Sequence, residues 1–208
     1  MRNRFFLAAL MITVSACAYS ANGEAANDKS KGIELENFYG LIINSPANII
    51  LEQADINSIR FEGEQKDINS TTTMIENGNL QISGSNQKPL TIYISFKEIN
   101  LIEINGNARI YSSQVINSDL LLLKINGSGT IRLDVRSLSL GMIVKGSGKI
   151  YASGSTGVSY ARIYGEGKII TTDLDSFEST EEVNSGRQAY RSSIRKADTM
   201  IPPSNMSN

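Results

Sequence analysis

Ile125-Asn126-Gly127-Ser128-Gly129 is one copy of a short pattern that recurs through the second half of the chain. The other copies are Ile104-Asn105-Gly106-Asn107-Ala108, Val144-Lys145-Gly146-Ser147-Gly148, Ile163-Tyr164-Gly165-Glu166-Gly167 and a degenerate Val183-Asn184-Ser185-Gly186. The first glycines of the four clear copies are 21, 19 and 19 residues apart. This regular interval indicates stacked units, each too small to bury its own apolar face.

Apolar residues alternate with polar ones on both sides of each glycine, a period of two that predicts strand, turn and strand. Isoleucine recurs four residues after each first glycine, at positions 110, 131, 150 and 169. Like residues at like positions predict coils that stack in register. We therefore expect an all-β fold, a parallel β-solenoid of about 19 residues per coil over residues 101–190. The last copy has Glu182 and Gln188 in its aliphatic columns, as expected of an atypical end unit.

An antiparallel β-sandwich is the alternative fold. Asn105-Gly106 and Asn126-Gly127 would suit hairpin turns between antiparallel strands. Later copies place Lys145 and Tyr164 at the first of these positions, where a type I′ turn needs a residue that tolerates positive φ. The turn residues therefore favour the solenoid.

The first half of the chain has strand chemistry without a strict period. Apolar segments at 38–43, 48–53, 59–63 and 90–94 alternate with turn residues, and Asn77-Gly78-Asn79 predicts a hairpin. We expect these strands to cover the entry end of the solenoid. One domain, residues 33–190, accounts for both halves.

The N-terminus has the pattern of an export signal. Two arginines precede an apolar core at 5–14 that is short for a transmembrane helix, and small residues lead to Cys17, the only cysteine. We predict a lipoprotein-type signal peptide at 1–16 and a lipid-modified Cys17. Cleavage by ordinary signal peptidase after Ala18 is the alternative. Ala18, in place of an aspartate, resembles the sorting signal of Gram-negative outer-membrane lipoproteins. Residues 17–32 would form a flexible tether, and residues 191–208 a frayed tail.

The composition argues against several functions. Without residues 1–16, which contain two of the 20 basic and none of the 21 acidic residues, the chain has net charge 18 − 21 = −3, so nucleic acid is not the expected partner. There is no histidine for a Ser-His triad or a His metal site. Isoleucines 131, 150 and 169 occupy the place where calcium-binding glycine repeats need aspartate, so no metal or cofactor is expected. Asp134, Asp173 and Asp175 do not recur at one position of successive coils, which disfavours a catalytic pair.

One column of basic residues stands out three residues after the first glycines. It consists of Arg109, Lys149, Lys168 and Arg187, with Thr130 between the first two. Stacked like charges are unfavourable unless acids or an anionic partner relieve them. Glu166 and Glu182 could supply that relief, or the column could bind phosphate or carboxylate groups of envelope glycans or lipids. Tyrosines 111, 151, 160, 164 and 190 either pack as ordinary strand residues or stack against sugars.

These segments, in this order, resemble the putative auto-transporter adhesin head GIN domain, a family of exported bacterial proteins. The resemblance covers about residues 33–190. It rests on Phe38-Tyr39-Gly40-Leu41, Asn48-Ile49-Ile50-Leu51-Glu52-Gln53, Asn77-Gly78-Asn79-Leu80 and the glycine motifs. It implies a right-handed β-solenoid on the cell envelope, without catalytic residues to transfer. The motif glycines, for which we expect a structural role in the turns, are Gly106, Gly127, Gly129, Gly146, Gly148, Gly165 and Gly167.

The sequence thus predicts a non-catalytic lipoprotein of the cell envelope that acts as an adhesin-like binding or structural module. Its expected partners are a membrane, reached through the lipid anchor, and an envelope glycan or protein. Two alternatives remain: a carbohydrate-active β-helix enzyme that cleaves polysaccharide, and a scaffold that pairs through a sheet edge.

Overall fold

The computed structural model describes residues 11–12, 32–85, 89–184 and 189–192. These residues form strands and one short helix, α1 (Gln65–Asn69). None of the described residues belongs to a helix long and apolar enough to cross a membrane. The strands are β1 (Met11–Ile12), β2 (Ile33–Glu34), β3 (Gly40–Ile43), β4 (Ala47–Gln53), β5 (Ser58–Glu62), β6 (Thr71–Glu76), β7 (Asn79–Gly84), β8 (Leu90–Phe96), β9 (Leu101–Gly106), β10 (Arg109–Ser112), β11 (Ile116–Gly127), β12 (Thr130–Gly146), β13 (Lys149–Tyr164), β14 (Lys168–Ile170), β15 (Leu174–Asn184) and β16 (Ala189–Ser192).

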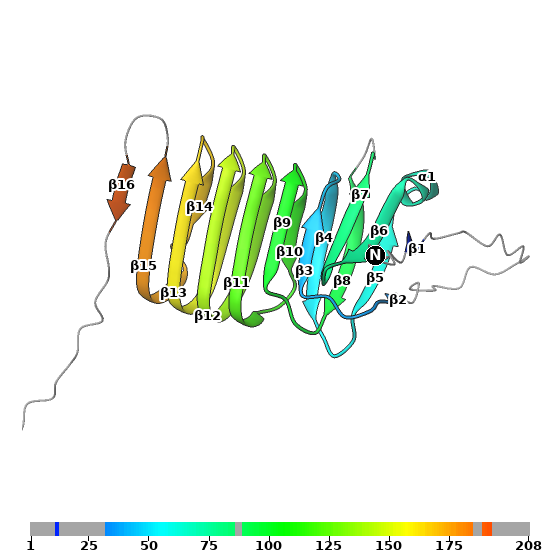
Figure 1. Cartoon of the computed structure of the whole chain (residues 1–208), viewed down its shortest axis with the longest axis horizontal. Coiled ribbons are helices and arrows are strands. Elements are labelled where there is room, and N and C mark those ends of the chain that lie inside the picture. The colour runs from blue at the N-terminus through cyan, green and yellow to red at the C-terminus, as the bar shows by residue number, and fades with distance from the viewer. Residues whose placement is uncertain (1–10, 13–31, 86–88, 185–188, 193–208) are drawn as a thin grey trace, which may run out of the picture.

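Successive coils pair in parallel, which confirms the solenoid and excludes the antiparallel sandwich. β11 pairs with β12 from Ile116 opposite Val135 to Gly127 opposite Gly146, and β12 pairs with β13 in the same sense. The stack of long strands is visible in Figure 1. The continuous sheet curls into two layers. Sheet I contains β4, β5, β8, β10, β14 and the first halves of β12 and β13. Sheet II contains β3, β6, β7, β9, β15 and the second halves of β11, β12 and β13.

The core between the two layers is aliphatic and arranged in ladders. Ile110, Ile131 and Ile150 are directly opposite one another in neighbouring coils and fully buried. Ile169 continues the ladder in β14 and is half-buried, because it lies at the C-terminal end of the stack. This confirms the predicted isoleucine ladder. The ladder also extends through Ile49 and Ile92, which the glycine repeat did not reveal.

The first half of the chain lies at one end of the solenoid, but its coils are not stacked in chain order (Figure 1). β4 pairs in parallel with β8 on one side and with β10 on the other. β3 likewise lies between β7 and β9. The first coil is therefore enclosed by two coils that come later in the sequence. β5 and β6 lie beyond β8 and β7, paired antiparallel to them.

The predicted hairpin is formed by β6 and β7, with Asn77 and Gly78 at positive φ in its turn. β1 pairs antiparallel with β6 and falls inside the segment that we assign to the signal peptide.

At the other end of the solenoid, the last step of the repeat is one residue longer than the step before it. Val144 lies opposite Ile163, and Ile163 lies opposite Val183. The longer step places Glu182 opposite Arg162 on the outer face. The prediction that Glu182 occupies an aliphatic column is therefore wrong. β16 then pairs antiparallel with β15, so the edge of sheet II is covered by a strand of opposite direction.

Candidate functional site

The glycine turns form one long edge of the solenoid, and their backbones lie in direct contact. Gly127 has φ +135°, and a Cβ atom there would be 2.5 Å from the carbonyl oxygen of Gly106. A Cβ on Gly148 would be 2.5 Å from Cγ2 of Ile125. The amides of Ser128 and Gly129 both donate to the carbonyl oxygen of Gly106 at 2.9 Å. These amides are therefore satisfied by the neighbouring coil rather than turned toward a ligand.

The basic column of the sequence forms a row on the outer face of sheet I. Arg109 lies opposite Thr130, Thr130 opposite Lys149, and Lys149 opposite Lys168. The three basic side chains are exposed. Within the described part of the chain none of the three forms an ion pair. We call Arg109, Lys149 and Lys168 the basic row; Arg187 lies outside the described residues.

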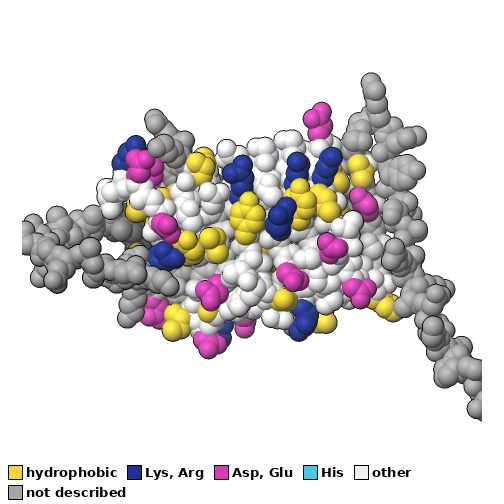
Figure 2. Space-filling model, turned by 180° about the vertical axis from the view of Figure 1, so that it is seen from behind, with side chains coloured by type: hydrophobic (Ala, Val, Ile, Leu, Met, Phe, Trp, Pro, Cys, Tyr) yellow, Lys and Arg dark blue, Asp and Glu magenta, His cyan; other side chains and the backbone are white. Residues whose placement is uncertain are grey.

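A second row runs beside the basic row on the same face. We call it the tyrosine row; in register order it consists of Arg60, Tyr93, Ile50, Tyr111, Arg132, Tyr151 and Ile170. The guanidinium of Arg60 lies 3.7 Å from the ring centre of Tyr93, and that of Arg132 lies 4.5 Å from the ring centre of Tyr151. Figure 2 shows Lys and Arg side chains gathered in one row, with a row rich in hydrophobic side chains below it.

Much of the tyrosine row was missed by sequence reasoning. Arg60, Ile50 and Tyr93 belong to coils that are out of chain order, so the glycine period could not align them. Arg132 was within reach, because it lies two residues after Thr130 and must share its face.

On the opposite face, on sheet II, two cations are paired with acids. Lys124 contacts Glu103 at 3.1 Å, and Arg162 contacts Glu182 at 2.6 Å. Glu182 therefore does not relieve the basic row, contrary to our expectation, because it lies on the other sheet. Burial raises the pKa of Tyr160, Arg162 opposes that rise, and Glu182 adds to it. These two cations of sheet II are compensated, whereas the three cations of the basic row have no ion pair within the described residues. The division is not complete: Arg60, at the end of the tyrosine row, contacts Glu62 at 3.6 Å, and Lys145 on sheet II has no ion pair in the described part of the chain.

An asparagine ladder also occupies the face of sheet II. The side-chain amide of Asn126 donates to the side-chain oxygen of Asn105, and that of Asn105 donates to Asn44, both at 2.8 Å. Such ladders stabilise stacked coils because every amide group finds a partner in the next coil. Side chains engaged in this way have less capacity left for a ligand.

The tyrosines singled out in the sequence divide between the two faces. Tyr111 and Tyr151 lie in the tyrosine row of sheet I, whereas Tyr160 and Tyr164 lie on sheet II. The Tyr190 side chain lies outside the described residues. Only the first pair can therefore act together with the basic row.

The carboxylates considered for catalysis do not converge. Asp134 lies opposite Ser153, whereas Asp175 lies opposite Ser155, so the two occupy different columns. Asp173 is in the turn before β15, where its backbone carbonyl accepts a hydrogen bond from the Gly154 amide. Among the described residues no group of three or more Cys, His, Asp or Glu side chains could hold a metal ion.

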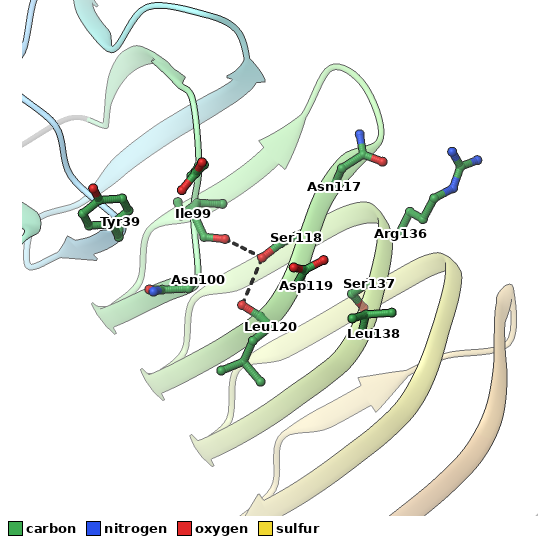
Figure 3. Close-up of a pocket in the computed structure, with 11 residues that line it drawn as sticks. Tyr39, Ile99, Asn100, Asn117, Ser118, Asp119, Leu120, Arg136, Ser137 and Leu138 are labelled. Carbon is green, nitrogen blue, oxygen red and sulfur yellow. Dashed lines mark hydrogen bonds between the residues drawn. The ribbon is translucent and has the colours of Figure 1, made fainter.

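The corner opposite the glycine turns carries exposed apolar side chains that the sequence analysis did not single out. Leu120, Leu138 and Phe177 are 62%, 68% and 74% exposed. The Ser118 hydroxyl lies within hydrogen-bond distance of two carbonyl oxygens at this corner, that of Ile99 at 2.7 Å and that of Leu120 at 3.0 Å, and its single proton is shared between them. An open groove of about 670 Å³ lies beside it and is shown in Figure 3. The sequence did not single out this corner, because an apolar residue at the surface is common and does not by itself indicate a site.

The family model of the "putative auto-transporter adhesin, head GIN domain" matches residues 37–199, well over half of the chain. The chain belongs to this family. The match includes every strand of this GIN domain from β3 to β16. Cys17, the predicted lipid anchor, precedes it and lies outside the described residues.

Solved structures share the fold of this GIN domain at low sequence identity. A putative adhesin from Bacteroides fragilis has a TM-score of 0.66 and 15% identity, over 74% of this chain and 78% of that chain. A putative adhesin from Parabacteroides merdae gives 0.57 and 15%, over 74% and 77%. A putative lipid binding protein from Parabacteroides distasonis gives 0.57 and 16%, over 76% and 79%. The comparison with curated proteins gave no match.

Proposed function

We propose that this GIN domain is a non-catalytic, adhesin-like binding module of the cell envelope, held in the outer membrane by a lipid on Cys17. In this proposal the outer face of sheet I binds phosphate or carboxylate groups of envelope glycans or lipids. The observation that carries it is the row of exposed cations without acidic partners among the described residues. The basic row is exposed and has no ion pair within the described part of the chain, while Lys124 and Arg162 on sheet II are paired with acids.

An uncompensated row of like charges costs folding free energy, so its presence needs a reason. Neighbouring strands are about 4.8 Å apart. Two like charges at that distance in water repel by about 0.9 kcal/mol before salt screening. An anionic ligand would remove that repulsion. The putative adhesins and the putative lipid binding protein with this fold are consistent with a binding role.

The binding site is tested by retention of the chain from residue 17 onward on two anionic surfaces. We would use immobilised polygalacturonate and phosphatidylglycerol vesicles, with dextran and phosphatidylcholine vesicles as neutral references. We expect retention on at least one anionic surface, and loss of it in the double variant Lys149→Glu, Lys168→Glu.

The matched control is Lys97→Glu, Arg136→Glu, which changes the net charge equally. Lys97 follows the end of β8, and Arg136 lies in β12 six residues beyond Thr130 and lines the groove beside Leu120, so both are at the corner away from the glycine turns and the basic row. Both side chains are exposed, so their replacement should leave the fold intact. Equal retention of the two double variants would refute the site.

Two further measurements test the remaining parts of the proposal. Globomycin-sensitive processing and detergent-phase partitioning should be lost in Cys17→Ser; a variant that still partitions into detergent would refute the anchor. The same polygalacturonate incubations should yield no new reducing ends or unsaturated products. Product formation that depends on Asp134 or Asp175 would favour the polysaccharide-cleaving alternative instead.

A further inference from the structure

The two rows on sheet I also indicate the shape of the ligand. We infer that it is an extended, linear, acidic polysaccharide that lies along the solenoid axis and crosses the strands at right angles. This inference rests on the proposed function of the same face. It selects a polymer over a lipid headgroup or a single anion.

The first argument is the direction of the rows. Arg109, Thr130, Lys149 and Lys168 follow one another across neighbouring strands, so the basic row is about 14 Å long at about 4.8 Å per strand. The tyrosine row continues across seven strands in parallel to it, from Arg60 to Ile170, over about 29 Å. A ligand that contacts several members of each row must itself be long and run along the axis.

The second argument is that the site has no point of convergence. The groove lies at the corner beside Leu120, whereas the basic row is at the other end of sheet I, next to the glycine turns. The amides that follow Gly127 and Gly146 donate to the neighbouring coil and are not turned toward a ligand. A single phosphate would therefore meet one or two exposed cations, and each such contact contributes little. Repeated contacts along a chain add up because later units bind as parts of one molecule.

The third argument concerns the chemistry of the tyrosine row. Tyr111 and Tyr151 present partly exposed rings beside Arg132, and Ile50 and Ile170 extend the same apolar strip. Rings with a polar hydroxyl group suit ligands that are apolar on one face and hydroxylated at the rim, as sugar rings are. Single-stranded nucleic acid combines stacking with charge as well. The acidic pI of about 5.6 opposes every polyanion at long range and does not separate the two polymers, so oligothymidylate is included in the test below.

Oligogalacturonates of one to eight units test this inference by titration calorimetry on the chain from residue 17 onward. We expect no measurable binding of the monomer, a rise in affinity of roughly 100-fold or more between two and six units, and a plateau once the rows are covered. The logarithm of the binding constant should fall with that of the salt concentration, with a slope of about −2 to −3 for three cations.

Three variants locate the polymer on the face. Lys149→Glu, Lys168→Glu should abolish binding of the hexamer, and Lys97→Glu, Arg136→Glu should leave it unchanged. Tyr151→Ser should weaken the hexamer about tenfold or more without changing the salt slope, because it removes stacking and no charge. Far-UV circular dichroism and thermal melting of each variant establish that it is folded.

The outcomes separate this inference from the proposed function. Affinity that is independent of chain length, or binding of phosphatidylglycerol vesicles with none of the oligogalacturonates, would overturn the polymer while the basic row remains a binding site. Binding of neither probe would overturn both. Oligothymidylate that binds as tightly as the hexamer of galacturonate would overturn the polysaccharide in favour of nucleic acid.

Discussion

A glycine-to-alanine pair in the turns separates backbone strain from the contact between coils. Gly106 and Gly127 have nearly the same φ, +127° and +135°, which L-residues rarely adopt. A Cβ atom on Gly106 would have no neighbour within 4 Å. A Cβ atom on Gly127 would be 2.5 Å from the carbonyl oxygen of Gly106, far inside van der Waals contact. Only the second substitution therefore forces two coils apart.

The expected magnitudes follow from these two environments. Gly106→Ala should lower the free energy of unfolding by about 1–3 kcal/mol, the cost of a side chain in this backbone region. Gly127→Ala adds the displacement of the Gly106 carbonyl, which accepts hydrogen bonds from the amides of Ser128 and Gly129. Losing both at about 1 kcal/mol each brings the total to about 3–5 kcal/mol. Gly165→Ala, with its Cβ 2.9 Å from the Gly146 carbonyl, should fall between the two.

Urea unfolding followed by far-UV circular dichroism and tyrosine fluorescence measures the series. The chain has eight tyrosines and no tryptophan, so the emission reports directly on the strands. The comparison requires that the free energy of unfolding depends on urea concentration with the same slope in all variants. If Gly106→Ala destabilises the protein as much as Gly127→Ala does, the close approach of successive turns is not what requires glycine.

Three further predictions concern other parts of the fold. Ile131→Ala should lower the free energy of unfolding by about 2–5 kcal/mol, because its side chain is fully buried in the ladder. Phe177→Ser should change it by less than about 0.5 kcal/mol, because that ring is 74% exposed. Urea unfolding compares the two variants, and a larger loss for Phe177→Ser would contradict the stack. Asn126→Ala should lower the free energy of unfolding by about 1 kcal/mol or more, because two side-chain hydrogen bonds are lost. Asn107→Ala, at an exposed position, should change it very little. Equal urea midpoints of the two variants would show that the asparagine ladder does not stabilise the fold. Addition of EDTA should leave the melting temperature unchanged, since no metal-binding group is present among the described residues; a fall of several degrees would indicate a structural metal ion.

The solenoid could be predicted from the sequence because the same residue types recur at the same step. Ile131, Ile150 and Ile169 follow one another at a constant interval, and parallel pairing in register then follows from the sequence alone. The place of β4 could not be predicted in this way. Ile49 lies opposite Ile92 of β8 and Ile110 of β10, and its separations from them in the chain are not multiples of the glycine period.

The candidate site was predictable to the same extent. The basic row was found because Lys149 and Lys168 follow the glycine period. The tyrosine row was found only in part, because three of its seven members come from the coils that are out of order. Glu182 was assigned to an inward column because the last repeat was taken to be as long as the one before it. The turn at 171–173 makes that repeat one residue longer. In the strand that follows, the side chains expected to face the core therefore face solvent, and the reverse.

The enclosed position of β3 and β4 bears on how the protein matures. The first coil of the domain to leave the ribosome cannot complete its hydrogen bonds until residues as far along as 112 have followed, whereas each coil after β9 can add to the one just made. Contacts between segments so distant in the chain slow folding, so assembly at this end should be the late and rate-limiting event. An unfinished chain would stay open at that end, which is compatible with the export that we propose for this protein.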